Sequence, residues 1–257
     1  MNKSLLENIR IVLVEPAGNL NVGSIARVMK NMGLTNLVLV NPRCDRNSEE
    51  ARIMAVHAAD VLENAVVVDS LPKALAGCQR AIATTVRSRS VPINLEPPSI
   101  ALPWLLEPNV NLNVQSALMF GAEDRGLSND ELKYAQKFVC VQSNPDYPSL
   151  NLAQAVAICA YEVYQAWLKI SDRSNQTATP PQVVSESIPK NAPIDVLEGY
   201  YQHLEDVLLE IGYLQPHTVP VKMEKFRRLY NKANLQSEEV AMLRGILRQV
   251  RWAIKNQ

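Results

Sequence analysis

The pattern of apolar and polar residues divides the chain into two regions. Over residues 9–168, short β-branched apolar runs alternate with segments whose apolar residues recur at helical spacing. This alternation is typical of β-α-β units and predicts an α/β fold with a largely parallel sheet. We expect six strands, each near-continuously apolar because helices cover both faces of such a sheet. They are Ile9–Glu15, Leu37–Asn41, Val66–Asp69, Arg80–Thr85, Ala117–Gly121 and Phe138–Ser143.

Three helices are predicted to follow strands of this sheet. The first begins at Asn21 to Ser24 and ends at Gly33, a residue suited to the left-handed conformation that terminates many helices. The second opens at Ser128, where Ser-Asn-Asp-Glu matches a capping box. The third runs from about Asn151 to Leu168. Its inward-facing residues are expected to be Leu152, Val156, Cys159, Val163 and Trp167.

A polar segment rich in Ser, Thr, Gln, Asn and Pro follows the α/β pattern. Its composition predicts a linker at residues 171–193. Two amphipathic helices are expected beyond it, Asp195–Gly212 and Ser237–Lys255, with a basic stretch between them. We therefore predict an α/β domain at 1–170 and a small helical domain at 194–257.

Charge is balanced over the whole chain but not within it. The chain has 26 basic and 26 acidic residues, whereas residues 219–257 hold nine Lys or Arg against three Glu. In the last helix, basic side chains form a stripe beside the apolar one. The stripe consists of Arg244, Arg248, Arg251 and Lys255. A solvated face would look the same, but the bias in sign favours contact with the phosphates of a nucleic acid.

Several classes of protein are excluded by the sequence. No apolar stretch approaches the roughly 18–20 residues of a membrane span, and Met1–Glu7 lacks a secretory pattern. We therefore expect a cytoplasmic protein with no membrane partner. The four cysteines are widely separated and the three histidines lack ligand spacing, so neither a disulfide framework nor a metal site is predicted.

Standard nucleotide-binding fingerprints do not fit. Gly18–Gly23 has glycines at the two ends of a P-loop, but Ser24-Ile25 follows where Lys-Ser/Thr is needed, and no G-x-G-x-x-G follows a predicted strand. Four polar clusters stand instead at the carboxyl ends of strands, the edge where open α/β sheets bind ligands. Each cluster alone could be an ordinary turn, but together they predict a site. They are Asn19–Arg27, Thr84–Arg89, Gly121–Leu127 and Asn144–Asn151.

Three of these segments are specific enough to indicate a family. LNVGSIARVMKNMG, FGAEDRGLSNDEL and SNPDYPSLNLAQAVAICAYEV resemble, in order and separation, the three motifs of the SpoU branch of the SPOUT RNA methyltransferases, over essentially residues 9–168. The resemblance implies S-adenosylmethionine-dependent methylation of a ribose 2′-hydroxyl by a homodimer, without a metal. It also implies a Rossmann-like sheet whose C-terminal third forms a deep trefoil knot. Thr84–Arg89 and the C-terminal extension resemble the members that modify tRNA at nucleotide 32 of the anticodon loop.

The resemblance carries site residues with it. Backbone groups of the knot loops are expected to bind the cofactor in a bent form, at Thr84, Thr85, Val86, Gly121, Val141, Pro148, Ser149 and Leu150. The expected catalytic residues are Arg27, Ser149, Asn151, Asn21 and Glu123. RNA contacts are expected from Arg87, Arg89, Tyr147, Arg244, Arg248 and Arg251.

The roles of the polar side chains leave alternatives open. The ribose oxygen must approach the sulfonium in line and lose a proton. Because a guanidinium keeps its own proton at cellular pH, Arg27 is favoured as a residue that holds the flanking phosphate and polarises the 2′-oxygen, with base action as the second reading. Glu123 either orients Arg27 or caps its own loop, Asn21 orients the RNA or the catalytic loop, and Tyr147 stacks on a base or anchors its loop.

Two positions depart from the family pattern, and two other functions compete. Leu20 stands where the family often has Gly, and Pro148, which cannot donate a backbone hydrogen bond, stands where a small hydroxyl residue is common. The competing functions are ribose methylation of ribosomal RNA and RNA binding without catalysis on the same fold. The motifs do not separate cytidine from uridine as the target.

Overall fold

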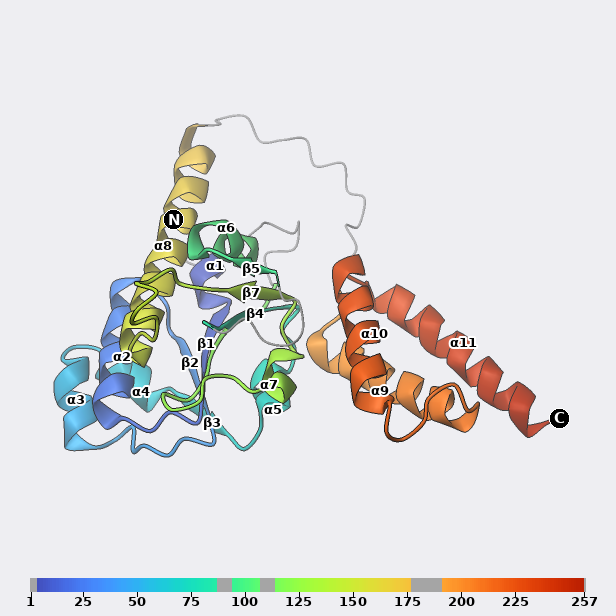
Figure 1. Cartoon of the computed structure of the whole chain (residues 1–257). Coiled ribbons are helices and arrows are strands. Elements are labelled where there is room, and N and C mark those ends of the chain that lie inside the picture. Colours follow the sequence, from blue (N-terminus) through green and yellow to red (C-terminus); the bar gives the residue numbers. More distant parts are fainter. Residues whose placement is uncertain (1–3, 87–93, 107–113, 177–190, 257) are drawn as a thin grey trace. The chain divides into compact units, whose positions relative to one another are not determined.

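The computed structural model describes residues 4–86, 94–106, 114–176 and 191–256, which divide into two compact units (Figure 1). The first, here called the α/β unit, contains the residues up to Leu75 and those from Arg80 through the last helix of the α/β pattern. The second, the helical unit, contains the C-terminal residues together with the turn Ala76–Gln79. The α/β and helical regions therefore form separate compact units.

A seven-stranded sheet forms the centre of the α/β unit, in the order β3-β2-β1-β6-β4-β7-β5. Every pairing is parallel, as predicted. The strands are β1 (Ile9–Val14), β2 (Asn36–Val40), β3 (Val66–Val68), β4 (Arg80–Thr84), β5 (Leu95–Glu96), β6 (Ser116–Phe120) and β7 (Lys137–Val139). The six predicted strands are present, and β5 was missed because two residues carry no pattern.

One expectation about burial is wrong. Val66 and Val67 of β3 are 55% and 50% exposed, although a strand covered on both faces was predicted there. The reason is position, since β3 is an edge strand with a neighbour on one side only.

The helices of the α/β unit are short except for two. They are α1 (Ser4–Glu7), α2 (Asn19–Asn31), α3 (Glu49–Ala55), α4 (Ala59–Glu63), α5 (Leu71–Leu75), α6 (Pro98–Ala101), the 3-10 helix η1 (Leu102–Leu105), α7 (Asn129–Leu132) and α8 (Leu152–Gln176). Gly33 has φ +68° after α2, and Ser128 forms the predicted capping box, although α7 is a single turn. Because α8 continues to Gln176, the expectation of a linker from residue 171 is wrong for its first six residues, and residues 177–190 lie outside the described part.

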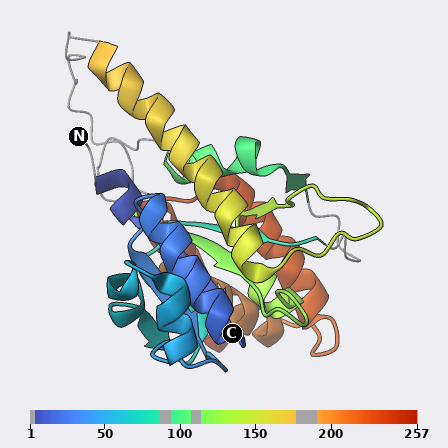
Figure 2. The ribbon, with the colours of Figure 1, turned by 90° about the vertical axis from the view of Figure 1, so that its left-hand side faces the viewer.

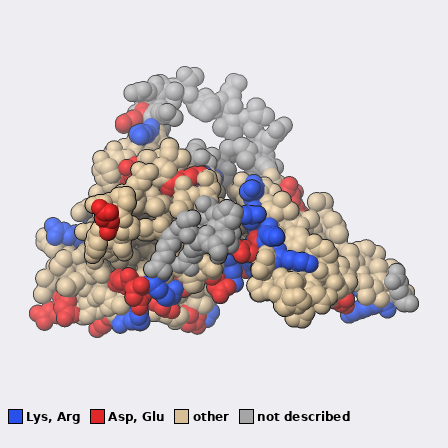
Figure 3. All heavy atoms as spheres, viewed as in Figure 1, with Lys and Arg blue, Asp and Glu red and all other residues tan. Residues whose placement is uncertain are grey.

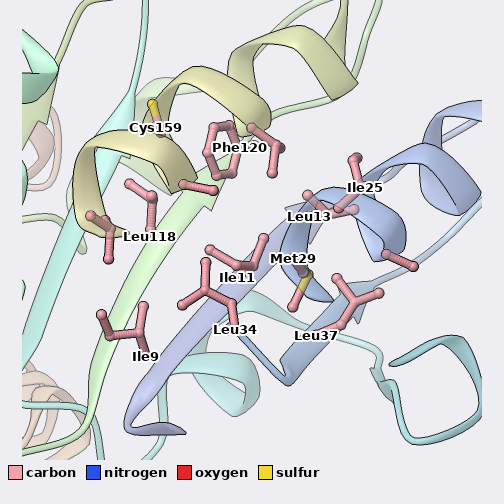
Figure 4. Close-up of a cluster of buried hydrophobic side chains, with 14 of the residues drawn as sticks. Ile9, Ile11, Leu13, Ile25, Met29, Leu34, Leu37, Leu118, Phe120 and Cys159 are labelled. Carbon is pink, nitrogen blue, oxygen red and sulfur yellow. The ribbon is translucent and has the colours of Figure 1, made fainter. Parts of the chain in front are cut away.

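The two long helices, α2 and α8, cover one face of the sheet side by side (Figure 2). Ile25 and Met29 of α2 pack against Ile11 and Leu13 of β1, and Cys159 of α8 lies over Phe120 (Figure 4). All five residues predicted to face inward from α8 are buried. This packing fixes both helices, whose N-termini lie at the carboxyl edge of the sheet.

The third helix of this layer approaches α2 without a side chain between them. A Cβ on Gly23 of α2 would lie 2.2 Å from the carbonyl oxygen of Ala51 in α3, which is far inside van der Waals contact. The glycine of the first motif is therefore required for helix packing.

The helical unit consists of α9 (Ile194–Glu210), α10 (Val219–Ala233) and α11 (Ser237–Lys255) around its own core. Tyr200 and Tyr201 of α9 are fully buried and pack edge-on or tilted against Tyr230 of α10. The sequence predicted α9 and α11 but only a basic stretch where α10 lies. Ile254, in the last turn of α11, is 37% exposed, so the apolar face of that helix is not buried at its end. Among the described helices, none is both long and apolar enough to cross a membrane.

Candidate active site

A carboxylate from the second motif holds the loop of the first. Glu123, three residues beyond β6, accepts hydrogen bonds from the backbone N–H groups of Ala17 (3.0 Å) and Gly18 (3.1 Å). The same carboxylate accepts a bond from Nδ2 of Asn21 at 3.2 Å. Gly18 is the N-cap of α2. Glu123 therefore accepts hydrogen bonds from backbone N–H groups at the start of that helix, where a negative charge is stabilised.

The third motif joins the same chain of contacts. Nδ2 of Asn151 donates to Oδ1 of Asn21 over 2.9 Å. Oδ1 of Asn151 accepts from the backbone N–H of Ala153 at 2.8 Å and so caps α8. Glu123, Asn21 and Asn151, which are up to 130 residues apart in the sequence, therefore form one hydrogen-bonded chain, here called the polar relay.

The charge state of Glu123 follows from these contacts. Burial raises the pKa of Glu123, but the hydrogen bonds from Ala17, from its own backbone N–H, from Asn21 and from Gly18 outweigh it, so that the pKa lies below its usual value. The carboxylate is therefore ionised at neutral pH and acts as an acceptor. It also accepts from its own backbone N–H, so capping of its own loop, one of the two roles considered from the sequence, stands beside capping of α2.

Arg27 lies on the same helix as Asn21, roughly 9 Å further along the axis at about 1.5 Å per residue. Its side chain is exposed. Within the described residues, no carboxylate forms an ion pair with Arg27. Its guanidinium is thus available for an external anion.

The loop before α8 is open to solvent. Tyr147, Pro148 and Ser149 are all exposed, Tyr147 by 79%. Ser143 Oγ donates to the carbonyl of Pro148 at 2.9 Å and closes the loop. An anchoring role for the Tyr147 ring is not supported at this exposure, which leaves the ring free to stack on a ligand. Ser149 precedes Asn151 by two residues and so lies next to the polar relay.

Of the residues expected to bind the cofactor, those that end or follow β4, β6 and β7 lie at one edge of the sheet. The strand register pairs Thr84 with Val139, and Ala83 with Met119. Val86, Gly121 and Val141 therefore follow neighbouring strands at the same level. The hydroxyl of Thr84 donates to the carbonyl of Met119 at 3.0 Å, so it forms its hydrogen bond within the sheet.

Gly121 admits no side chain. A Cβ there would lie 2.1 Å from the carbonyl carbon of Gly126 and 2.2 Å from the backbone nitrogen of Leu127. The loop after β6 therefore folds directly against its own beginning, and an Ala122–Gly126 bridge closes it. This leaves backbone groups, rather than side chains, at the carboxyl end of β6.

The residues expected to bind RNA are distributed over both units. Arg87 and Arg89 lie outside the described residues. Arg244 and Arg248 are exposed on α11, whereas Arg251 pairs with Glu210 of α9 at 2.8 Å. Figure 3 shows a row of basic side chains over α10. The exposed basic residues of that helix are Lys225, Arg228 and Lys232.

Two arginines beside the polar relay were missed. Arg125 pairs with Glu131 and Glu15, and Arg43 pairs with Asp124. Arg125 stands inside the second motif, and that position was an available signal; Arg43 stands in a loop with no pattern. No group of three or more potential metal ligands occurs among the residues that the structure describes.

The α/β unit thus brings its three motif segments together at the carboxyl edge of a parallel sheet. Residues 8–161 match the SpoU rRNA Methylase family, and the chain belongs to this family. Residues 195–257 match the C-terminal domain of the tRNA methyltransferase TrmJ.

Relatives that match nearly the whole chain are tRNA methyltransferases as well. The chain is 43% identical over 247 residues to the tRNA (cytidine/uridine-2′-O-)-methyltransferase TrmJ of Klebsiella pneumoniae, covering 96% of this chain and 97% of that protein. Identity to TrmJ of Cronobacter sakazakii is 44% with the same coverage. The crystal structure of TrmJ from Z. mobilis ZM4 matches with a TM-score of 0.78 at 32% identity, over 94% of this chain and 98% of that one. The predicted fold class is confirmed by these matches.

Proposed function

We propose that this protein transfers a methyl group from S-adenosylmethionine to the ribose 2′-hydroxyl of nucleotide 32 in the tRNA anticodon loop. The relatives that carry TrmJ in their names support tRNA as the substrate class. The observation that carries the proposal is the polar relay, because it brings the three motif segments to one point. Arg27 is exposed on the same helix as Asn21 and has no ion pair within the described residues.

The carboxyl ends of β4, β6 and β7 suit an adenosine and its sulfonium side chain. The close approach at Gly121 leaves backbone donors and acceptors exposed there, and Val86 and Val141 supply neutral surface. Thr85, Ser149 and Leu150 complete the proposed binding residues, whereas Thr84 and Pro148 contribute through their backbone. S-adenosylmethionine would supply a methyl group already activated for nucleophilic attack.

Arg27 is the residue we assign to the RNA at the reaction centre. Its exposed, unpaired guanidinium suits a bidentate contact with the phosphate next to the target ribose. The same cation lowers the cost of negative charge developing on the 2′-oxygen. Since a guanidinium stays protonated at cellular pH, the proton of the hydroxyl leaves to solvent water. It passes either directly or through the exposed hydroxyl of Ser149, which would donate its own proton to water as it accepts one.

Asn21 and Asn151 hold the geometry rather than transfer protons. Both amides have a fixed direction, because Glu123 can only accept and the N–H of Ala153 can only donate. The relay therefore orients α2 relative to the loop that carries Ser149. Positioning of this kind can supply a large part of the rate of a transfer from an activated donor.

The helical unit is proposed to bind the body of the tRNA. Arg244 and Arg248 on α11 and the exposed basic residues on α10 offer a surface for phosphates. In the α/β unit, Tyr147 is proposed to stack on a base, with Arg87 and Arg89 as further contacts. We also propose a cytoplasmic homodimer, a trefoil knot in the last third of the α/β unit, and domain limits at residues 170 and 194.

The proposal is tested by incubating the protein with labelled S-adenosylmethionine and unmodified total tRNA. Nuclease digestion then locates the resistant methylated linkage. We expect label at nucleotide 32 and its loss in Arg27→Ala, with S-adenosylmethionine affinity retained in calorimetry. Arg52→Ala, which removes an exposed guanidinium from α3, serves as the matched control and should keep full activity.

The same assay separates the competing functions. Label in ribosomal RNA fragments but never in tRNA would overturn the tRNA assignment. Failure to bind S-adenosylmethionine, with tRNA binding intact, would indicate an RNA-binding protein without catalysis. Deletion of residues 191–257 should abolish tRNA methylation while sparing cofactor binding, and tRNA methylation at an unchanged rate would contradict the role given to the helical unit.

A further inference from the structure

Arg125 makes four contacts, three of them within the second motif and one with Glu15 at the end of β1. Its two terminal nitrogens donate to both carboxylate oxygens of Glu131, each at 2.8 Å. One nitrogen also pairs with Glu15 at 3.0 Å, and the other donates to the carbonyl of Gly126 at 3.0 Å. The bonds to Glu131 and Glu15 raise the pKa of Arg125, so its charge is permanent.

Arg43 makes a second connection to the same segment. Its guanidinium binds both oxygens of Asp124 at 3.2 Å, and its backbone N–H donates to the carbonyl of Pro16 at 2.9 Å. Its Nε also points to the carbonyl of Glu15 at 3.4 Å. Asp124 and Arg125, the two residues that follow Glu123 in the chain, are therefore linked to residues 15 and 16.

Residues 15 and 16 immediately precede the two N–H groups that Glu123 binds. Glu15 has φ +49°, a left-handed conformation that is uncommon for a residue with a side chain. Such a conformation persists only where its surroundings hold it, and Arg125 on its carboxylate together with the bond from its N–H to Val40 does so. The turn that leads into α2 thus depends on the charge of Arg125.

The burial of these groups makes the connection more than a surface ion pair. The side chains of Glu131 and Arg125 are 17% and 37% exposed, and the bidentate geometry is the strong form of an arginine–carboxylate contact. Glu131 forms one more hydrogen bond, because it also accepts from the N–H of Ser128 in the capping box of α7. Arg125 therefore links α7, the loop of Glu123 and the end of β1.

We propose that Arg125 is a positioning residue for methyl transfer, which acts through Glu15 and Glu123 to hold Asn21 and so α2 in the orientation that the reaction needs. This rests on the proposed function, because the reaction is the one assigned above. Arg125 itself touches neither substrate nor cofactor in this assignment. Its removal should lower turnover and leave ligand affinity almost unchanged.

The first experiment compares Arg125→Gln, Arg125→Lys and Lys133→Gln in steady-state tRNA methylation. We expect Arg125→Gln to lower kcat by about tenfold to a hundredfold, the loss typical of a misplaced reacting group, with KM for either substrate little changed. Arg125→Lys should recover part of the loss, because an ammonium can still pair with Glu131. Lys133→Gln removes a nearby cation that pairs with the exposed Asp130 and lies over the ring of Tyr134, and it should leave kcat unchanged.

The second experiment asks whether the effect passes through Asn21. In an Asn21→Ala background, Arg125→Gln should add little to the loss, since the residue through which it acts is gone. Losses that multiply, or a wild-type kcat in Arg125→Gln, would overturn the proposal.

A third measurement needs no enzymatic activity. Backbone hydrogen exchange at Ala17 and Gly18, whose N–H groups Glu123 binds, should accelerate in Arg125→Gln and not in Lys133→Gln. Unchanged exchange overturns the positioning role even if the chain methylates tRNA. Faster exchange in a chain that methylates another RNA would leave the connection standing and remove only the proposed substrate.

Discussion

Asn151 donates to Asn21 over 2.9 Å, and the direction of that bond is determined from both ends. Glu123, ionised at neutral pH, can only accept from Asn21, and the N–H of Ala153 can only donate to Asn151. An amide at each of the two positions is therefore required, because one nitrogen must donate and one oxygen must accept at each step.

Replacement of Asn21 tests this directionality. Asn21→Asp should be more damaging than Asn21→Ala, because it places a second carboxylate against Glu123 and removes the donor. We expect kcat to fall by roughly tenfold in Asn21→Ala and further in Asn21→Asp, as expected of misplaced reactants. Steady-state methylation measures this, with Asn64→Asp at the exposed end of α4 as the control. Equal losses in the two Asn21 variants would argue against a directional relay.

Glu123 predicts a particular dependence on pH. Its folded-state pKa lies below the ordinary value of about 4.3, so its stabilising contribution is complete above that value and is lost as the pH falls through the folded-state pKa. The difference in unfolding free energy between wild type and Glu123→Gln should therefore be constant above about pH 5 and shrink in stronger acid.

Denaturant unfolding at a series of pH values from neutral to acid measures that difference. Because the carboxylate is ionised throughout the neutral range, Glu123→Gln should also lower the methylation rate without changing the shape of its profile above pH 6. A limb of the rate profile that disappears in Glu123→Gln would show proton transfer by this group instead.

Gly121 should tolerate no side chain. The Cβ of Gly121→Ala would meet Gly126 at 2.1 Å, and overpacking of this kind costs about 1–3 kcal/mol. Because the strain falls on the loop at the proposed cofactor edge, S-adenosylmethionine affinity in calorimetry should fall together with stability. Gly199→Ala is the matched control, since its Cβ would meet nothing nearer than 3.7 Å and it lies inside α9. Cofactor binding that survives in Gly121→Ala would place the cofactor elsewhere.

Two of the three arginines of α11 should differ although the sequence treats them alike. Arg248 is exposed, whereas Arg251 is engaged by Glu210 at 2.8 Å. Arg248→Ala should reduce the slope of log affinity for tRNA against log salt by about 0.7–0.9, the value for one phosphate contact. Arg251→Ala should reduce it less. Filter binding over a range of salt concentrations gives both slopes, and equal slopes would show that Glu210 releases Arg251 to the RNA.

The sequence predicted the strands of the sheet and the long helices because burial on two faces leaves a continuous or periodic apolar signal. It did not predict β5, which is two residues long, or α10, whose exposed basic face hides a narrow apolar stripe. It predicted covered valines in β3 because periodicity does not reveal which strand lies at an edge. In each case the missing information is the identity of a neighbour.

The candidate site shows the same division. Asn21, Glu123 and Asn151 were selected as site residues from motif resemblance, but their order of contact needed three strands and two helices in place. Arg43 could not be selected, because its partner Asp124 is 81 residues away. Ion pairs between distant loops leave no mark on local sequence.

The contact between Gly23 and Ala51 limits how the enzyme can adapt to its substrate. With the backbones of α2 and α3 touching, the helix that carries Arg27 has no free volume into which it could retreat. An RNA that reaches this arginine must supply the adjustment itself. Unpaired nucleotides can swing out at little cost and stacked duplexes cannot, so rigidity on the protein side is itself a filter for flexible loops.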